Sequence, residues 1–267
     1  MRTLVLILAA SSVLLAQRLD PEEIMRRAIA STERSWKARQ NYTYLERDEE
    51  RHLDSRGGVK WTNVSVTRTV VVDGLPVDQT VSHNGVPPTS AEKKKNEEAL
   101  RKAKSPADRA EELRKAKENR AFIDEVPAAF DFKLLAEQQM NGRQAYLLQC
   151  TPKPGYHVPG KYGKMFSKVE GKVWVDKQDF GWIRVDAKVT EPISMGFFLA
   201  RLQPGSHIVF EQTRIADGLW MPLHVEVKAE AKILFIKNYV QEEKITFSEY
   251  RPAQPTQVAS SVPVVRR

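Results

Sequence analysis

The segment LHVEVKAEAKILF, residues 223–235, carries the clearest structural signal in the chain. Apolar residues occupy every odd position from Leu223 to Phe235, and His, Glu or Lys occupies every even position between 224 and 232. This period of two predicts a β-strand with one apolar and one polar face. Such a strand would be roughly twice the usual length of five or six residues. Strands of this length favour a large, strongly curved sheet over a compact sandwich.

The same alternation recurs along most of the chain, with Asn-Gly or Asp-Gly pairs marking turns between several of the segments. It predicts further strands at 42–51, 60–72, 77–82, 130–136, 146–150, 208–215, 219–227 and 240–250. No internal repeat is present. We therefore expect one mainly antiparallel β domain over residues 17–251, in the α+β class.

A hairpin is predicted at GKVWVDKQDFGWIRVDAKV, residues 171–189, where small apolar residues share one face. Trp174 and Trp182 fall on the opposite face, and an in-phase register would let them touch. Two interpretations stay open. The tryptophans form a structural cross-strand pair, or they stand at the mouth of a cavity between a curved sheet and the helices that cover it.

An amphipathic helix is predicted at the N-terminal end of this domain. Asp20 is a good N-cap, Pro21 suits the first helical position, and two acidic residues follow in the first turn. Apolar or small residues then recur every four positions, at Ile24, Ala28, Thr32 and Trp36. The stripe predicts a helix over residues 21–39 that covers the sheet.

Residues 89–120 differ from the rest, because they are charged and helix-forming rather than alternating. Residues 91–120 hold 11 Lys or Arg against 7 Asp or Glu, a local net charge of +4, and Pro106 splits the segment into two predicted helices. The segment is either a solvated excursion from the β domain or a surface that docks on anionic lipid or an acidic partner.

The stretch EPISMGFFLARLQPGSH, residues 191–207, is crowded with large apolar side chains and lacks strand alternation. It is interpreted as a short helix that plugs the barrel or as a mobile apolar lid that contacts a ligand. Exposed apolar residues in such numbers would otherwise favour aggregation. The residues concerned are Met195, Phe197, Phe198, Leu199 and Leu202.

The two ends of the chain are expected to lie outside the domain. Arg2 and the short apolar run of residues 4–16 predict a secretory signal peptide over residues 1–16, with a retained membrane anchor as the alternative. The tail over residues 252–267 is expected to be disordered. The single cysteine, Cys150, cannot form an internal disulfide and is expected to be a buried thiol.

The chain has a net charge of +8. After export to the periplasm, this charge favours an anionic membrane surface or another envelope component as partner, and not nucleic acid. The five histidines are scattered without metal-ligand spacing, and neither a nucleophile elbow nor a glycine-rich phosphate loop is present. We therefore expect no metal, no cofactor and no enzymatic activity.

Two short motifs resemble a known group. Gly171-Lys-Val-Trp174-Val-Asp176 is similar to the glycine-x-x-Trp-Ile/Val-Asp strand of the outer-membrane lipoprotein-sorting group, within the LolA/LolB-like superfamily. Asp217-Gly-Leu-Trp220-Met-Pro222 resembles the Asp-Gly-x-Trp-x-Pro turn of the same group. The resemblance implies a curved, half-open β-barrel whose concave side, lidded by helices, holds acyl chains of a lipoprotein or a similar amphiphile. The charged segment and the basic net charge depart from that pattern.

The sequence thus predicts an exported, non-catalytic envelope protein that binds or carries lipid or lipoprotein acyl chains in an apolar cavity. The alternative is an envelope scaffold or sensor that docks a protein partner through its basic helical segment. The candidate residues of the cavity and its lid are Trp36, Trp174, Trp182, Met195, Phe197, Phe198, Leu199, Leu202 and Trp220.

Overall fold

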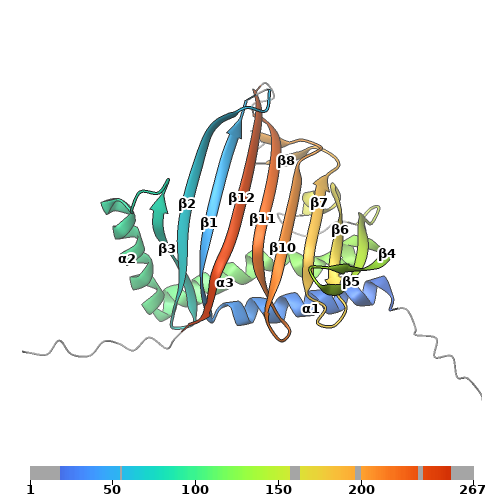
Figure 1. Cartoon of the computed structure of the whole chain (residues 1–267), viewed down its shortest axis with the longest axis horizontal. Coiled ribbons are helices and arrows are strands. Elements are labelled where there is room, and N and C mark those ends of the chain that lie inside the picture. The colour runs from blue at the N-terminus through green and yellow to red at the C-terminus, as the bar shows by residue number, and fades with distance from the viewer. Residues whose placement is uncertain (1–18, 55, 157–162, 196–199, 234–236, 254–267) are drawn as a thin grey trace, which may run out of the picture.

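The computed structural model describes residues 19–54, 56–156, 163–195, 200–233 and 237–253. Within these ranges twelve strands form one antiparallel sheet in the order β3-β2-β1-β12-β11-β10-β7-β6-β5-β4, and the short β9 joins β11 and β8 (Figure 1). In chain order the strands are β1 (Tyr42–Leu53), β2 (Val59–Val72), β3 (Leu75–His83), β4 (Phe130–Met140), β5 (Arg143–Pro152), β6 (Val169–Asp176), β7 (Trp182–Val189), β8 (Ile193–Met195), β9 (Ala200–Leu202), β10 (His207–Ala216), β11 (Leu219–Ile233) and β12 (Lys237–Pro252).

The sheet is curved and does not close, since β3 and β4 are its two edge strands and do not pair with each other. This confirms the half-open, mainly antiparallel architecture that the alternation predicts. The long strand expected from residue 223 is longer still: β11 begins at Leu219 and holds 15 residues. β12 extends to Pro252, one residue into the predicted tail, and the rest of that tail beyond residue 253 lies outside the described residues, as do the predicted leader and Phe235.

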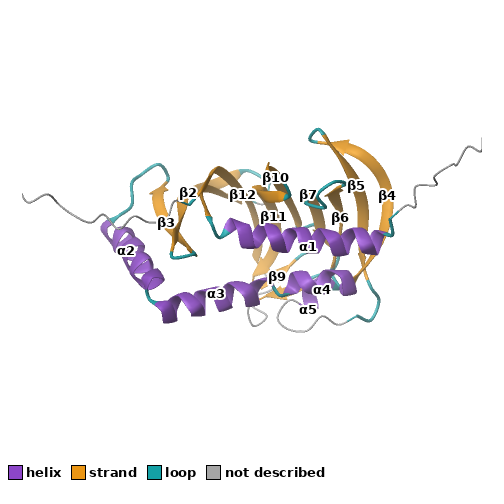
Figure 2. Cartoon of the chain, turned by 90° about the horizontal axis from the view of Figure 1, so that it is seen from below, coloured by secondary structure: helices purple, strands orange, loops and turns teal. Residues whose placement is uncertain are grey.

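Helices α1, α3 and α4 lie on one side of the sheet, with α1 running across the strands and α3 and α4 beside it (Figure 2), whereas α2 packs on the edge strand β3. The helices are α1 (Pro21–Arg39), α2 (Ser90–Lys104), α3 (Pro106–Arg120), α4 (Phe122–Ala129) and α5 (Gly163–Phe166). The α1 prediction is confirmed, with Asp20 accepting a hydrogen bond from the Glu22 N–H. No helix among the described residues is long and apolar enough to cross a membrane.

The charged segment folds as two helices divided at Pro106, as predicted, and Thr89 is the N-cap of the first. The Thr89 hydroxyl accepts from the Glu92 N–H, and the Glu92 carboxylate accepts from the Thr89 N–H, which is the reciprocal capping box. The following helix, α4, is absent from the sequence-based prediction. Its interior holds Pro127, which argues locally against a helix.

The main core lies between α1, α4, α5 and strands β4–β7. Its fully buried side chains include Ile24, Met25, Leu148 and Val175. Cys150 belongs to the same core, and burial raises the pKa of its thiol to about 12. The expectation of a buried thiol is therefore confirmed.

Directly paired residues of antiparallel strands share a face. The pairing therefore identifies, strand by strand, the residues that lie on the same face of the sheet as the main core. We call this face the helix-facing side and the opposite face the outer side. One row of paired residues on the helix-facing side starts in the core and runs through Val173, Val185, Phe210, Val225, Ile245, Asp48 and Ser65. The side chains of this row are therefore apolar from β6 to β12, acidic on β1 and uncharged polar on β2.

The predicted contact between Trp174 and Trp182 is wrong. Trp174 pairs with Arg184, whereas Val175 pairs with Trp182, so Ile183 is an extra residue that bulges out of β7. The bulge reverses the alternation beyond it. Trp182 consequently packs against the main core, and Trp174 packs against a second cluster formed by Ala145, Ile183 and Trp220.

The β3 edge is covered by α2. Leu75 and Val77 of β3 pack against Ala103 of the helix in a small separate core. The side-chain amide of Asn96 accepts from the Thr80 N–H and donates to the Thr80 carbonyl, both at 3.0 Å. Asn96 thereby occupies part of the hydrogen-bonding edge that a neighbouring strand would take. By contrast, α3 has no fully buried side chain, and only its Leu113 packs against this small core.

Candidate functional site

An apolar strip lies on the helix-facing side next to the main core. It consists of Ile208 and Phe210 on β10, which pair with Val227 and Val225 on β11. Ile208 exposes 41% of its surface, and the other three side chains are half-buried. Since these residues face the helix layer and are still exposed, the helices leave this part of the sheet open.

An acidic row adjoins the apolar strip. Glu46, Asp48 and Glu50 alternate along β1 on the helix-facing side, and Glu243 on β12 pairs with both Glu50 and Val227. None of these four carboxylates forms an ion pair with a described residue. On the outer side of the same strands the acids are paired, as in the contacts of Glu49 with Arg47 and Arg51.

Three carboxylates of the acidic row have raised pKa values. Burial raises the pKa of Asp48, and burial together with the negative charges of Asp48 and Glu50 raises the pKa of Glu243. Burial, with the nearby charge of Asp78 next in importance, likewise raises the pKa of Glu46. The buried Oδ1 atom of Asp48 has no hydrogen-bond partner among the described residues.

Aromatic rings close one end of the acidic row. His52 follows Glu50 on the helix-facing side of β1, and its ring lies 4.5 Å from that of Tyr239 and 5.5 Å from that of Trp61, measured between centroids. The helix-facing side beyond the main core is therefore amphipathic. It offers an open apolar surface beside carboxylates that can receive cationic groups, and nothing in this arrangement resembles a catalytic pair.

The structure distributes the predicted cavity residues among different places. Trp220 is 3% exposed and lies with Trp174 in the second cluster, whereas Trp182 belongs to the main core. Trp36 lies under the guanidinium of Arg120, 4.8 Å from its ring centroid. Met195 and Leu202 lie in β8 and β9, and Phe197, Phe198 and Leu199 lie outside the described residues. The four tryptophans therefore do not form a single site.

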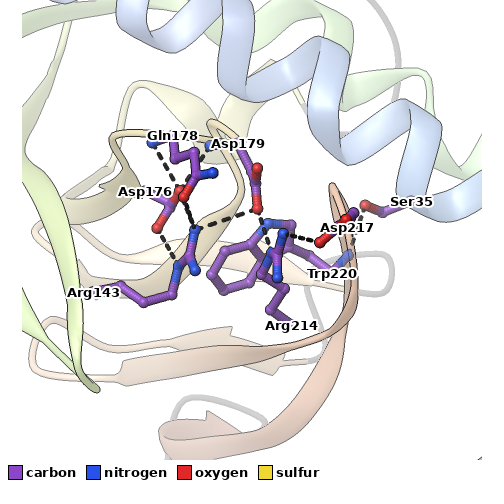
Figure 3. Close-up of polar contacts among 8 residues, drawn as sticks. All are labelled: Ser35, Arg143, Asp176, Gln178, Asp179, Arg214, Asp217 and Trp220. Carbon is purple, nitrogen blue, oxygen red and sulfur yellow. Dashed lines mark hydrogen bonds and ion pairs between the residues drawn. The ribbon is translucent and has the colours of Figure 1, made fainter.

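The two sequence motifs meet in space, and Figure 3 shows the side chains that join them. Asp176, which is 1% exposed, accepts two hydrogen bonds from Arg143, at 2.5 and 3.0 Å, and two more from backbone N–H groups in the β6–β7 turn. Asp179 in that turn accepts from Arg143 at 3.3 Å and from Arg214 at 2.5 Å. Arg214 also holds Asp217 in the β10–β11 turn. These contacts tie the two turns together.

The same cluster is fixed to α1, because the Trp220 N–H donates to the Ser35 hydroxyl at 3.1 Å. Burial acts to raise the pKa of Asp176, but the hydrogen bonds from Arg143 and from the turn outweigh it and hold the pKa below its ordinary value. The Asp176 carboxylate thus stays ionised as the anchor of the turn. The motif residues have a structural role here.

Sequence reasoning missed the apolar strip and the acidic row as a site. One signal was available: β1 carries acids on both of its faces, so neither face qualifies as an ordinary core face. The position of the row beside the strip depends on the pairing of β1, β12 and β11, which the sequence does not reveal. Among the described residues no group of three or more His, Cys, Asp or Glu side chains could hold a metal ion.

No protein-family model matches this chain, and no curated protein matches it. Several solved structures do. A DUF1329 family protein from Desulfovibrio piger shares 15% identity, with 91% of this chain and 96% of that chain covered and a TM-score of 0.36. A putative outer membrane lipoprotein-sorting protein domain from Vibrio parahaemolyticus shares 11% identity, with 89% and 95% covered and a TM-score of 0.36.

A LolA superfamily protein from Nitrosomonas europaea shares 9% identity, with 89% of this chain and 95% of that chain covered and a TM-score of 0.31. The matching structures thus include members of the group that the two motifs resemble. At these identities and TM-scores, the likeness carries no argument about what this chain binds.

Proposed function

We propose that this protein is an exported envelope protein that binds lipid or lipoprotein acyl chains on its helix-facing side, without catalysis. The observation that carries the proposal is the apolar strip, which the helices leave open. A chain laid along the strip removes apolar surface from water, which is worth about 25 cal/mol per Å². The signal-peptide pattern at the N-terminus supports a periplasmic location.

The proposal is tested by placing a charge on the strip. Ile208→Asp adds a carboxylate to the open surface, where it would have to be desolvated under a bound chain. Native mass spectrometry, combined with lipid extraction from protein purified from a bacterial periplasm, should show at least about a tenfold loss of co-purifying acyl chains. Binding of a fluorescent fatty acid in titration should weaken to a similar extent.

Val81→Asp is the matched control, because Val81 exposes the same 41% of its surface on β3, away from the strip. It should leave lipid binding unchanged. Both variants should keep the circular dichroism spectrum of the parent protein. An Ile208→Asp variant that folds and still carries as much lipid as the parent would exclude the strip as the binding surface.

The second candidate function is docking of a protein partner through the basic helices. It is supported by α3, which has no fully buried side chain, and by the local net charge of +4 over residues 91–120. Reversing the exposed Lys93, Lys94 and Lys95 to Glu should abolish capture of an acidic envelope partner but leave lipid binding intact. Equal capture by the reversed variant would eliminate this alternative.

A further inference from the structure

A separate cavity of about 550 Å³ opens between the end of the β4–β5 hairpin and strands β10 and β11, away from the apolar strip. We call it the outer pocket. We propose that the outer pocket binds a small organic carboxylate that carries an apolar group. The site is distinct from the apolar strip, and its ligand is independent of the function proposed above.

Two arginines supply the charge of the outer pocket. Arg143 uses its Nε and Nη2 atoms to hold Asp176 and Asp179, and Arg214 uses its Nε and Nη2 atoms to hold Asp179 and Asp217 (Figure 3). In both residues Nη1 has no hydrogen-bond acceptor among the described residues. Each side chain remains about a quarter exposed, at 26% and 25%. The aspartates thus fix both guanidinium groups in position, and each keeps one N–H₂ group available for a ligand.

The second feature is Gln212, which lines the outer pocket on the same strand as Arg214. Its side chain is only 8% exposed, yet its amide carbonyl has no hydrogen-bond partner among the described residues. A buried amide oxygen without a hydrogen bond destabilises the folded protein, and a polar group of a ligand can supply the missing bond. Because the two ends of an amide exchange by a simple flip, Gln212 can donate to an oxygen that also accepts from the arginines.

The other residues that line the outer pocket determine the polarity and the charge of the ligand. Met140, Ile183, Leu223 and the ring of Trp220 form an apolar wall, and the Arg143 guanidinium lies 5.7 Å from the centroid of that ring. The Glu211 carboxylate also lines the pocket, but Arg184 and His224 hold it. Since Asp176, Asp179 and Asp217 already offset the two arginine charges, only the unpaired Nη1 groups remain for an anion, and the pocket suits a single negative charge better than a doubly charged phosphate.

The test uses N-acetyl-L-leucine as the acid and N-acetyl-L-leucinamide as its neutral counterpart of equal shape. Both are titrated into the full-length protein while the indole N–H resonance of Trp220 is followed by NMR. The resonance of Trp61, on the distant strand β2, serves as the internal reference. We expect a saturable shift of the Trp220 signal with the acid and no saturable shift with the amide.

Gln212→Leu should weaken binding of the acid by about tenfold, because it removes a buried hydrogen-bonding group of the site. The same variant should raise Tm, since it removes an amide that has no partner when the pocket is empty. A residue with a purely structural role would lower Tm instead. Arg214→Gln should also weaken binding by about tenfold, and Arg68→Gln, which breaks an outer-side ion pair far from the pocket, should not.

Three results would overturn the proposal: no saturable shift with the acid, equal binding of acid and amide, or unchanged binding in Gln212→Leu. The outcome is separable from that of the proposed function. Ile208→Asp should weaken acyl-chain binding at least about tenfold and leave the Trp220 titration unchanged, whereas Gln212→Leu should weaken binding of the acid about tenfold and leave acyl-chain binding unchanged. Loss of acid binding in Ile208→Asp would place the acid on the apolar strip and not in the outer pocket.

Discussion

At the scale of single residues, glycine decides how closely the hairpins approach each other. A Cβ atom on Gly181 would lie 2.1 Å from Nε1 of Trp220 and 2.3 Å from its Cδ1 atom. On Gly171 it would lie 2.5 Å from the carbonyl oxygen of Asp186. Neither position needs glycine for a left-handed backbone; both need it because another group occupies the space of the side chain.

Gly181→Ala should therefore lower the free energy of unfolding by about 2 kcal/mol, because the indole of Trp220 must move from its place in the second cluster. Urea denaturation of the variant measures this loss. The further change Trp220→Leu should recover part of it in the double variant, since the smaller side chain gives way to the new methyl group. If the two losses simply add, the contact of the ring with Gly181 is not the cause.

The residue scale is also where sequence reasoning failed most clearly. Trp174 and Trp182 follow a regular alternation, and nothing in the local sequence marks Ile183 as the extra residue. The bulge is set by the pairing of β7 with β6 and by the packing of Trp220, which lies far away in the chain. A single inserted residue sends every side chain beyond it to the other face.

At the scale of elements, the β3 edge shows how a helix can end a sheet. Asn96 is half-buried in α2 and offers one donor and one acceptor to the backbone of Thr80, as a neighbouring strand would. Removal of the amide leaves both Thr80 groups without these partners. The edge would then be available for pairing with another chain.

Asn96→Ala should lower the free energy of unfolding by about 1 kcal/mol, which is typical of lost hydrogen bonds that water can partly replace. Hydrogen exchange should locate the effect: the Thr80 amide should exchange faster, while amides in β11 stay protected. Lys95→Ala is the control, because Lys95 is exposed on the same helix. Unchanged exchange at Thr80 in Asn96→Ala would show that the amide does not protect the edge.

The elements themselves were largely predictable, because their signals are local. Asp20 and Pro21 fix the start of α1, Pro106 divides α2 from α3, and Asn141 with Gly142 forms the tight turn between β4 and β5. The helix α4 was missed since Pro127 lies inside it. It exists because its apolar residues pack on the main core, where Phe122 and Val126 contact the cluster.

At the scale of the whole molecule, the acidic row makes stability depend on pH. A carboxyl whose pKa is raised in the folded state binds more protons there than in the unfolded chain. The folded state is therefore favoured as the pH falls from 7 toward about 5, above the ordinary pKa of about 4. The opposite holds for Asp176, whose lowered pKa gives stability that is lost as the pH falls below about 4.

Asp48→Asn should raise the free energy of unfolding at pH 7 by about 0.5 kcal/mol, allowing for screening by solvent. The gain should shrink as the pH falls from 7 toward about 4, because the raised pKa lets Asp48 bind its proton at a higher pH in the folded parent protein than in the unfolded chain. NMR titration should also show lower pKa values for Glu46 and Glu243, which lose a neighbouring negative charge.

Glu49→Gln is the control on the outer side of the same strand. Hydrogen bonds from Arg47 and Arg51 lower the pKa of Glu49, so its neutralisation should not stabilise the protein at pH 7. If Asp48→Asn and Glu49→Gln change stability alike, the difference between the two sides of the sheet has no energetic consequence.

The acidic row could not be predicted as a unit, because β1 and β12 lie about two hundred residues apart and meet only through the sheet. Asp48 is paired with Ile245, and Glu50 with Glu243. From the sequence alone, each of these carboxylates is one more charged residue on an alternating strand. Their lack of counter-ions is a property of the assembled face.

The length of α1 has a geometric consequence for the whole sheet. The helix packs on β4 near its start and reaches Tyr44 of β1 at Arg39, so it joins strands that are seven spacings apart in the sheet order. Seven spacings of about 4.8 Å make a flat width of roughly 34 Å. The 19 residues of α1 span only about 28 Å. The helix is thus shorter than the stretch of sheet that it joins, so the sheet must curve between β1 and β4. One added helical turn would let the sheet flatten and would move these two strands apart.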